Sequence, residues 1–232
     1  MDLVTSTERI GDVLVVHLDD GKANALSTQM IGDITSAISV AEADDDVVAV
    51  VLHGREGRFS AGFDLSVMRG GDLHAMVGLV ADGGDLVRRI HGASVPVVAA
   101  CTGHALAAGA LMLLGCDVRI GADVDCRIGL NEVAIGMVLP DWAFTIAVDR
   151  LARRHLQRAV ATAHVTGPHD AVDVGFLDEV VPADRVLDRA VEVASSFSAL
   201  DARAYAGTVT KLRGGVLQAM ADQVAADRAA LG

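Results

Sequence analysis

The chain has 232 residues, of which 52% are hydrophobic and only 3% aromatic, and its formal net charge is -12. A chain of this length and composition can bury one large core, filled by aliphatic rather than aromatic side chains. The acidic balance argues against a surface for nucleic acid or for an anionic membrane. We therefore expect neither nucleic acid nor a membrane among the partners.

Three cysteines, Cys101, Cys116 and Cys126, lie in apolar or strand-like stretches without the spacing of a metal site. An odd number of such cysteines indicates reduced thiols in the core of a cytosolic protein. The first twelve residues contain neither a basic segment nor an apolar one, so no export signal is predicted. The expected location is the cytoplasm.

The predicted elements alternate between strands and helices along the chain. Residues 12–20 are expected to form a strand, and residues 27–44 a helix with Ser27 as its N-cap. Residues 47–53 read as a second buried strand, and residues 117–122 as a further short one. Strands separated by helices indicate a mostly parallel sheet with helices packed on it. The apolar face of the predicted helix contains Met30, Ile31, Ile34, Ile38 and Ala41.

Residues 92–116 contain no Asp, Glu, Lys or Arg, which raises the question of a membrane span. The length would suffice, but Pro96 and several polar or glycine residues interrupt the run, and no basic flank or aromatic belt follows it. The first part of the run is short and β-branched, as in a buried strand. The second part is rich in small and apolar residues, as in a buried helix. We expect a buried strand, a glycine-containing turn and a buried helix.

The strand signal disappears from about Val186 onward. The remaining residues predict Ala-rich amphipathic helices with a break at Gly214–Gly215. The expected organisation is a core over residues 1–185 and a helical lobe over residues 186–232. The apolar faces of these helices exceed what one small lobe can bury, so we expect a trimer or a dimer of trimers.

Three stretches contain more glycine and polarity than a core element requires, and the first is residues 57–65. This stretch, GRFSAGFDL, directly follows a predicted strand. Its Ser-Ala-Gly turn leaves successive backbone N–H groups pointing outward, a concavity that suits an anion. An ordinary strand-to-helix turn, with Asp64 capping the next helix, explains the same residues.

The second stretch is residues 102–110, TGHALAAGA, where a turn opens a helix. The first N–H groups of a helix have no intrahelical partner and carry the positive end of the helix dipole. An enolate or thioester oxygen placed there would be stabilised without a charged side chain. The alternative is a helix that begins in the core and uses its small residues for close packing, with His104 as a hydrogen-bonded core histidine.

The third stretch is residues 128–142, in which Glu132 stands among apolar residues. Burial of a carboxylate in apolar surroundings raises its pKa, which suits proton transfer near neutrality. A solvated loop glutamate is the alternative. The histidines show no H-E-x-x-H spacing or other metal pattern, so no metal site is expected. The sequence also contains no G-x-S-x-G, P-loop or G-x-G-x-x-G motif, which disfavours hydrolase-elbow, nucleoside triphosphatase and dinucleotide-binding functions.

In chain order these stretches resemble the crotonase superfamily, the enoyl-CoA hydratase/isomerase fold, over roughly residues 10–185. The resemblance implies an α/β fold, with a crotonase-like spiral core of ββα turns and a helical C-terminal lobe. It also implies an acyl-CoA thioester substrate, with coenzyme A as part of the substrate and no separate cofactor. The motifs that carry it are KANALS, VVAVVLHG, RFSAGFDL, PVVAACTGHALAAGALMLLGCDVRIGA, GLNEVAIGMVLP and AVDVGFLDEVVP.

The resemblance assigns roles to particular residues. It places the two backbone N–H donors of an oxyanion hole at Phe63 and Ala108, and the catalytic acid/base at Glu132. Ala108 stands where many members carry glycine, and because the donor is backbone, the change is expected to narrow the hole by one methyl group. The implied substrate pocket comprises Ala61, Asp64, Leu65, Gly109, Leu111, Asp141 and Trp142.

Leu111 departs from the pattern of the family's hydratases, which carry a glutamate at this position as well as at the position of Glu132. Two carboxylates hold and activate water in those enzymes, whereas shifting a double bond needs only one. Leucine together with GLNE resembles the 3,2-trans-enoyl-CoA isomerases, so the expected reaction converts 3-enoyl-CoA to 2-enoyl-CoA in fatty acid metabolism. Asp141 is a candidate second acid if its loop folds over the site, although an exposed loop aspartate is the preferred interpretation.

Other functions on the same scaffold remain open. The nearest alternative is an enoyl-CoA hydratase, which adds water to 2-enoyl-CoA. Thioester hydrolysis or carbon–carbon cleavage are further alternatives. A non-catalytic acyl-CoA-binding protein is also conceivable, because an oxyanion hole binds thioesters whether or not a base works beside it.

Overall fold

The computed structural model describes residues 4–230. Its larger sheet has six strands in the order β1-β2-β3-β5-β7-β9. The first strand is antiparallel to its neighbour and all other neighbours are parallel. The strands are β1 (Thr5–Ile10), β2 (Val13–Leu18), β3 (Ala49–Gly54), β5 (Val97–Cys101), β7 (Val118–Ala122) and β9 (Glu179–Val181).

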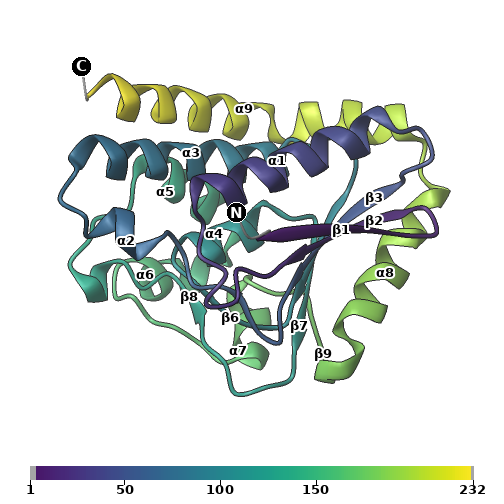
Figure 1. Ribbon diagram of the computed structural model, residues 1–232, viewed down its shortest axis with the longest axis horizontal. Helices are drawn as coiled ribbons and strands as arrows, with labels where there is room; N and C mark the ends of the chain where they lie inside the picture. The colour runs from purple at the N-terminus through teal and green to yellow at the C-terminus, as the bar shows by residue number, and fades with distance from the viewer. Residues whose placement is uncertain (1–3, 231–232) are drawn as a thin grey trace.

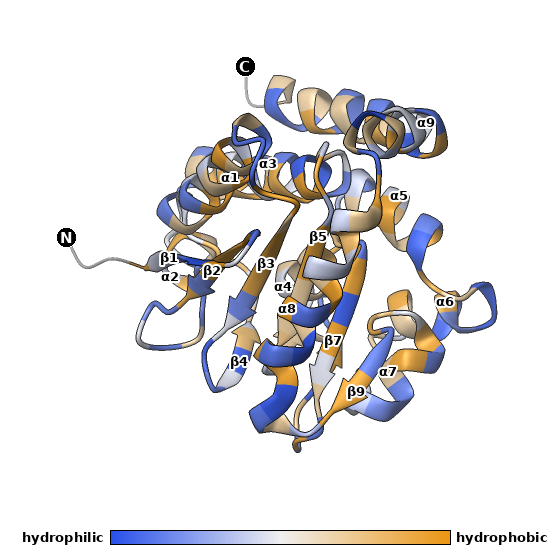
Figure 2. Ribbon diagram, turned by 90° about the vertical axis from the view of Figure 1, so that its right-hand side faces the viewer, coloured by the Kyte–Doolittle hydropathy of each residue, from blue (hydrophilic) through white to orange (hydrophobic). Residues whose placement is uncertain are grey.

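Helices cover both faces of this sheet. The helix α8 (Val186–Ser196) packs on β3, β5 and β7 from one side, and Figure 2 shows it in front of these strands. The helices α1 (Thr28–Ala43) and α3 (Leu73–His91) lie on the other side, packed against each other. Because each face is covered, the central strands are largely apolar, as is typical of parallel sheets.

Residues that alternate along each strand supply two separate cores. On β2, Val15 faces the core that contains Val186 and Ala190 of α8. Val16 faces the larger core under α1 and α3. This alternation follows from the two-residue period of a strand. The scarcity of charged side chains in the central strands therefore reflects burial on two faces, and the charged Arg119 of β7 pairs with Asp178.

A second, smaller sheet is formed by short strands that the sequence patterns did not predict. It consists of β4 (Gly57–Ser60), β6 (Gly103–Leu106) and β8 (Ile128–Gly129), in the order β4-β6-β8. All its pairings are parallel. At two to four residues each, these strands are too short to show a clear alternation in sequence.

The remaining helices surround the two sheets. The longest, α9 (Ala202–Ala229), lies across the top of the molecule in Figure 1 and packs on α3 and α5. Short 3-10 turns occupy residues 133–135, 183–185 and 197–199. The other helices are α2 (Leu65–Met68), α4 (Ala108–Gly115), α5 (Asp141–Arg150), α6 (Arg153–Val160) and α7 (Pro168–Val174).

Most predicted elements are confirmed. Ser27 caps α1 by accepting a hydrogen bond from the Met30 amide, and the predicted apolar face of that helix is buried. Asp64 caps α2 through the Ser66 amide. The three cysteines are free and buried. The expected α/β fold with a helical C-terminal segment is therefore present.

The uncharged run folds as β5, β6 and α4, all in the interior. The expected turn is itself a strand, because residues 103–106 pair with β4 and β8. Every residue of α4 is buried. Within residues 4–230 no helix is both long enough and apolar enough to cross a membrane.

The predicted break at Gly214–Gly215 is wrong, since α9 runs through both glycines without interruption. A glycine inside a helix costs only about 1 kcal/mol relative to alanine, which packing on α3 and α5 offsets. The division of the chain after residue 185 stays a prediction, and its outermost residues, 1–3 and 231–232, lie outside the described residues.

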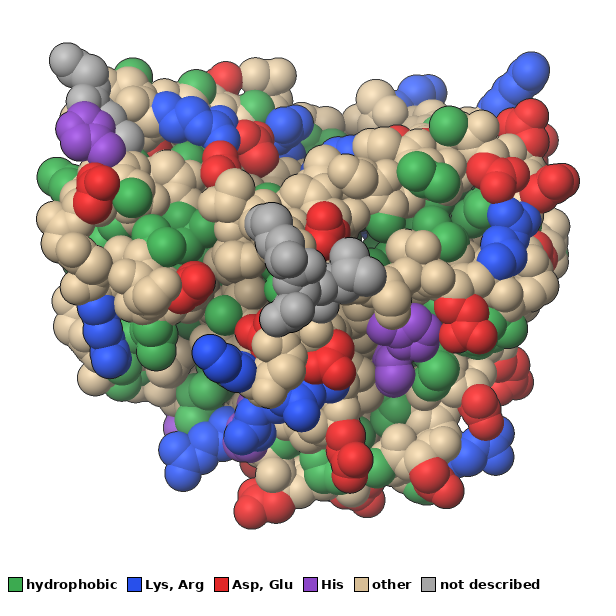
Figure 3. Space-filling view, in the orientation of Figure 1, with side chains coloured by type: hydrophobic (Ala, Val, Ile, Leu, Met, Phe, Trp, Pro, Cys, Tyr) green, Lys and Arg blue, Asp and Glu red, His purple; other side chains and the backbone are tan. Residues whose placement is uncertain are grey.

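The surface is mixed in charge. Figure 3 shows Asp and Glu side chains interspersed with Lys and Arg over the face in view. Several of them form ion pairs, such as Arg228 with Asp82 and Asp85. Exposed pairs of this kind contribute little to stability, on the order of 0–1 kcal/mol each.

Candidate active site

The three glycine-rich stretches meet at one edge of the small sheet. Residues 61–63 directly follow β4, residues 107–108 follow β6, and Glu132 stands three residues beyond β8. These strands are neighbours and parallel, so their carboxyl ends lie side by side. Ligand sites of α/β proteins commonly form outside the carboxyl ends of such strands. The topology thus assembles residues that are far apart in the sequence.

The amide of Phe63 points into this edge. Leu26 donates a hydrogen bond to the Gly62 carbonyl (2.8 Å) and accepts one from the Asp64 amide (3.2 Å). In an extended segment, alternate residues direct their N–H groups to opposite sides. The N–H of Phe63 therefore points away from Leu26, and among the hydrogen bonds of residues 4–230 it has no acceptor. The Phe63 ring is anchored against Gly83 of α3.

The amide of Ala108 is available for a different reason. Ala108 is the first residue of α4, where an N–H group has no partner within the helix. The preceding amide, that of Ala107, donates to the Gly129 carbonyl (3.0 Å) and ties the helix start to β8. No acceptor for the Ala108 amide occurs in the described part of the chain.

The two amides are close together. A Cβ built on Gly62, the residue before Phe63, would lie only 3.5 Å from the Ala108 nitrogen. The two amides thus belong to adjacent segments, and amides that converge on one point would stabilise an oxygen on which negative charge develops.

Ala107 holds an unusual backbone conformation, with φ 50° and ψ -126°. Such angles are rare for residues other than glycine and cost on the order of 1–3 kcal/mol. The surrounding structure maintains them, because the Ala107 carbonyl accepts hydrogen bonds from the amides of Ala110 and Leu111. This turn redirects the chain from β6 into α4 and presents the next amide.

Glu132 is buried, with 7% of the residue exposed. Its Oε2 atom is inaccessible and has no hydrogen-bond partner among the described residues. Burial raises the pKa of Glu132 to about 7, and only its own backbone amide acts in the opposite direction. The sequence-based alternative of a solvated loop glutamate therefore does not hold, and this carboxyl can exchange a proton near neutral pH.

A cavity of about 470 Å³ opens beside these groups. Of the predicted pocket residues, Ala61, Leu65, Leu111 and Trp142 line it, as do Phe63 and Glu132. Leu111 is 1% exposed and Trp142 is fully buried. The rest of the wall is mostly apolar and includes Met68, Met76, Val77, Val80, Met137 and Val138.

Three residues predicted for the pocket do not line this cavity. Asp141 begins α5 and is exposed, as its preferred sequence-based interpretation held. Asp64 is engaged as the cap of α2. Gly109 packs against the Ser60 backbone behind the cavity, where its lack of a side chain permits the contact.

The cavity also contains polar residues that the sequence analysis did not single out. Asn131 precedes Glu132, and its Oδ1 atom is buried without a partner in the described structure. Arg69 follows α2, and Asp227 belongs to α9. No local motif marks Asp227, since it reaches the cavity only through the docking of α9.

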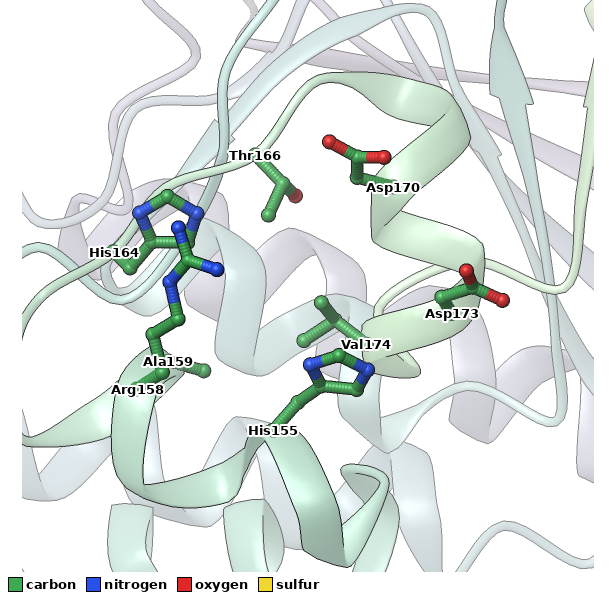
Figure 4. Close-up of a pocket in the computed structure, with 8 residues that line it drawn as sticks. All are labelled: His155, Arg158, Ala159, His164, Thr166, Asp170, Asp173 and Val174. Carbon is green, nitrogen blue, oxygen red and sulfur yellow. The ribbon is translucent and has the colours of Figure 1, made fainter.

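A second hollow, of about 180 Å³, lies between α6 and α7. Figure 4 shows its polar side chains, including His155 and Arg158 on α6 and Asp170 and Asp173 on α7. None of the predicted site residues lines it. Within residues 4–230, no group of three or more His, Cys, Asp or Glu side chains is placed to hold a metal ion.

The buried thiols and His104 lie outside the cavity wall. Burial raises the pKa of Cys101 and Cys116 strongly and that of Cys126 to about 11, so these thiols remain protonated. The Nδ1 atom of His104 accepts a hydrogen bond from the Arg127 amide (3.0 Å), in keeping with a structural role.

Comparison with known proteins agrees with this geometry. A profile of the enoyl-CoA hydratase/isomerase family matches residues 8–231. The chain belongs to the enoyl-CoA hydratase/isomerase family. It is thus an enzyme of the crotonase superfamily, as the sequence motifs indicated.

Among the relatives, some are named enoyl-CoA isomerases and others enoyl-CoA hydratases. The chain is 32% identical over 200 residues to mitochondrial enoyl-CoA delta isomerase 1 of Mus musculus, covering 85% of this chain and 69% of the mouse enzyme. It is 31% identical over 193 residues to the short-chain-enoyl-CoA hydratase of Clostridium acetobutylicum, covering 81% and 72% of the two chains. A solved structure of a family protein from Pseudomonas syringae superposes with a TM-score of 0.93 at 36% identity, covering 97% and 96%.

Proposed function

We propose that this enzyme shifts the double bond of a 3-enoyl-CoA to give the conjugated 2-enoyl-CoA. The observation that carries the proposal is the buried Glu132 carboxyl, which lines the same cavity as Phe63 and Leu111. Burial is the cause that raises the pKa of Glu132, and no neighbouring charge contributes to it. The position where family hydratases resemble one another in having a second glutamate is taken by buried Leu111.

In this reaction Glu132 removes a proton from C2 of the substrate. The electrons of the C2–H bond form a double bond to C1, and the thioester oxygen becomes an enolate. The amides of Phe63 and Ala108 donate hydrogen bonds to that oxygen, which lowers the energy of the dienolate. Glu132 then returns its proton to C4, and the double bond moves to C2–C3.

The apolar surroundings favour return of the proton over addition of water. Leu111 faces the cavity, and an aliphatic side chain does not hold a water in place for attack. The same surroundings keep the pKa of Glu132 near 7, so the carboxyl can act as base and then as acid.

The alternative is hydration of 2-enoyl-CoA. Asn131 favours it, because its buried Oδ1 lacks a donor and could accept a hydrogen bond from a water beside Glu132. Hydratases also occur among the relatives. Incubation of the purified protein with 3-enoyl-CoA and with 2-enoyl-CoA distinguishes the two. Faster conversion of 3-enoyl-CoA supports the isomerase, and faster formation of 3-hydroxyacyl-CoA supports the hydratase.

The proposed reaction uses coenzyme A as part of the substrate and no separate cofactor. We also propose a homotrimer or a dimer of trimers, supported by exposed apolar side chains such as Leu200 and Leu212 in the C-terminal segment. Light scattering at micromolar concentration tests this, and a monomer would contradict it. The cytoplasmic location stays a prediction.

A further inference from the structure

Asp227 introduces a carboxyl into an otherwise largely apolar part of the cavity. It lines the cavity from α9, and Met76, Val77 and Val80 of the neighbouring α3 line the same cavity. Asp227 is half-buried, and its Oδ2 atom is inaccessible to solvent and accepts no hydrogen bond from any described residue. The adjacent cation, Arg228, binds Asp82 and Asp85 at 2.7 Å each and does not neutralise it.

A buried donor without an acceptor lies in the same corner. Trp142 is fully buried, and its Nε1–H has no partner among the described residues. A Cβ on Gly84 would lie 2.9 Å from this nitrogen and 2.7 Å from Cγ2 of Val224, which places the indole edge at the contact of α3 with α9. Val224 and Asp227 are three residues apart and therefore share a face of α9.

Asp227 reaches the cavity from α9, whereas Phe63 and Glu132 reach it from segments that follow the strands of the small sheet. Burial and the neighbouring charge of Asp141, the first residue of α5, raise the pKa of Asp227. Asp227 would therefore meet a part of the acyl group other than the carbons on which Glu132 acts.

We propose that Asp227 determines substrate specificity by selecting acyl groups that carry a hydroxyl beyond the reacting carbons. This inference rests on the proposed function of the cavity as an acyl-CoA site. A plain alkyl chain would cover the carboxyl without giving it a hydrogen bond, which is unfavourable. A hydroxyl group on the acyl chain can donate a hydrogen bond to the carboxyl of Asp227. The hydroxyl oxygen can also accept a hydrogen bond from Nε1–H of Trp142, which has no acceptor among the described residues.

The test compares binding of saturated acyl-CoA pairs by titration calorimetry. Each pair is an unsubstituted acyl-CoA and its ω-hydroxy counterpart, in a series from butanoyl to decanoyl. Saturated thioesters cannot isomerise, so their affinities do not depend on the chemical step. We expect the wild type to prefer the hydroxylated member of at least one pair by about tenfold or more, the effect of one hydrogen bond to a charged group.

Variants assign the preference to Asp227. Asp227→Leu is expected to abolish or reverse the preference for the hydroxylated acyl-CoA. Asp227→Asn keeps a hydrogen-bonding group and is expected to retain part of that preference. Asp222→Leu is the matched control, because Asp222 is exposed on the same helix and bonds Gln218 instead. It should leave the ratio unchanged.

The outcomes separate this inference from the proposed function. Equal affinities within every pair, or a preference that survives in Asp227→Leu, would overturn the inference alone. A preference without turnover of any enoyl-CoA would support the inference and overturn the proposed reaction. If no acyl-CoA bound to the protein, both the inference on Asp227 and the proposed function would be overturned.

Discussion

Gly109, in the first turn of α4, lies directly against the backbone of Ser60 at the end of β4. A Cβ on residue 109 would sit 2.8 Å from both the carbonyl carbon and the Cβ of Ser60, and closer still to the carbonyl oxygen. Real Cβ atoms do not approach backbone this closely. The glycine therefore permits the contact that holds the start of α4 beside β4, the strand that leads to Phe63.

Gly109→Ala is expected to push α4 away from β4. The displacement should separate the two amide donors and lower turnover by about tenfold or more, since loss of one oxyanion donor costs about 100-fold to 1000-fold. Overpacking should also lower the free energy of unfolding by about 1–3 kcal/mol. Steady-state kinetics and urea denaturation measure both effects. Gly78→Ala on α3 is the control, because a Cβ there meets nothing within 4 Å.

Glu132→Gln removes the proposed base while keeping its shape. Turnover should fall by about two to four orders of magnitude, with acyl-CoA binding largely retained because the backbone donors are untouched. In the wild type, kcat/KM should rise with pH through about 7, as the Glu132 carboxyl loses its proton. Near-normal activity of Glu132→Gln would show that another group is the base.

The same substitution has a predicted effect on stability that is independent of substrate. The pKa of Glu132 is higher in the folded chain than in the unfolded one, so ionisation weakens the fold as pH rises from about 4.5 to about 7. Glu132→Gln avoids this loss. Its free energy of unfolding relative to wild type should therefore increase over that interval, by on the order of 2–3 kcal/mol. Urea titrations at pH 5 and pH 8 test this, and a difference that does not change with pH would contradict the burial of a charged form.

Leu111→Glu should shift the ratio of hydration to isomerisation toward hydration, provided that the new carboxylate holds a water together with Glu132. It should also destabilise the fold by several kcal/mol, about the cost of burying a polar group in an apolar wall. Product analysis from both enoyl-CoA isomers gives the ratio. Leu111→Gln is the control, since it is polar but cannot act as a base. A wild type that already hydrates faster than it isomerises would support the hydratase alternative.

Ala107→Gly should stabilise the protein, although it removes a methyl group. Glycine adopts the φ of 50° found at this position without steric strain. We expect a gain of about 1 kcal/mol in the free energy of unfolding, reduced by the greater freedom of glycine in the unfolded chain. Ala110→Gly, the same change two positions into regular helix, should instead cost about 1 kcal/mol or more. A loss of stability in Ala107→Gly would mean that the methyl group contributes packing that outweighs the strain.

The sequence predicted α1 and four strands of the larger sheet, β2, β3, β5 and β7, because buried strands and an amphipathic helix leave clear patterns. It did not predict the edge strands β1 and β9, which are not buried on both faces. It also indicated the residues 61–63, 108 and 132 that the fold brings to one edge. The small sheet that assembles them was not predicted, since strands such as Ile128–Gly129 are too short for any pattern. The position of Asp227 in the cavity could likewise not be predicted. It depends on how α9 packs on the rest of the chain, and no local sequence pattern marks it.

The docking of α9 closes a cavity whose other groups come from distant parts of the chain. Phe63 and Glu132 come from the first two thirds of the chain, whereas the wall at Asp227 and Ala230 comes from the end of the longest helix. A displacement of this helix from α3 and α5 would open the cavity to water. Water beside Glu132 would reduce the desolvation that raises its pKa, so the basicity of this carboxyl depends on the contacts of the C-terminal helix.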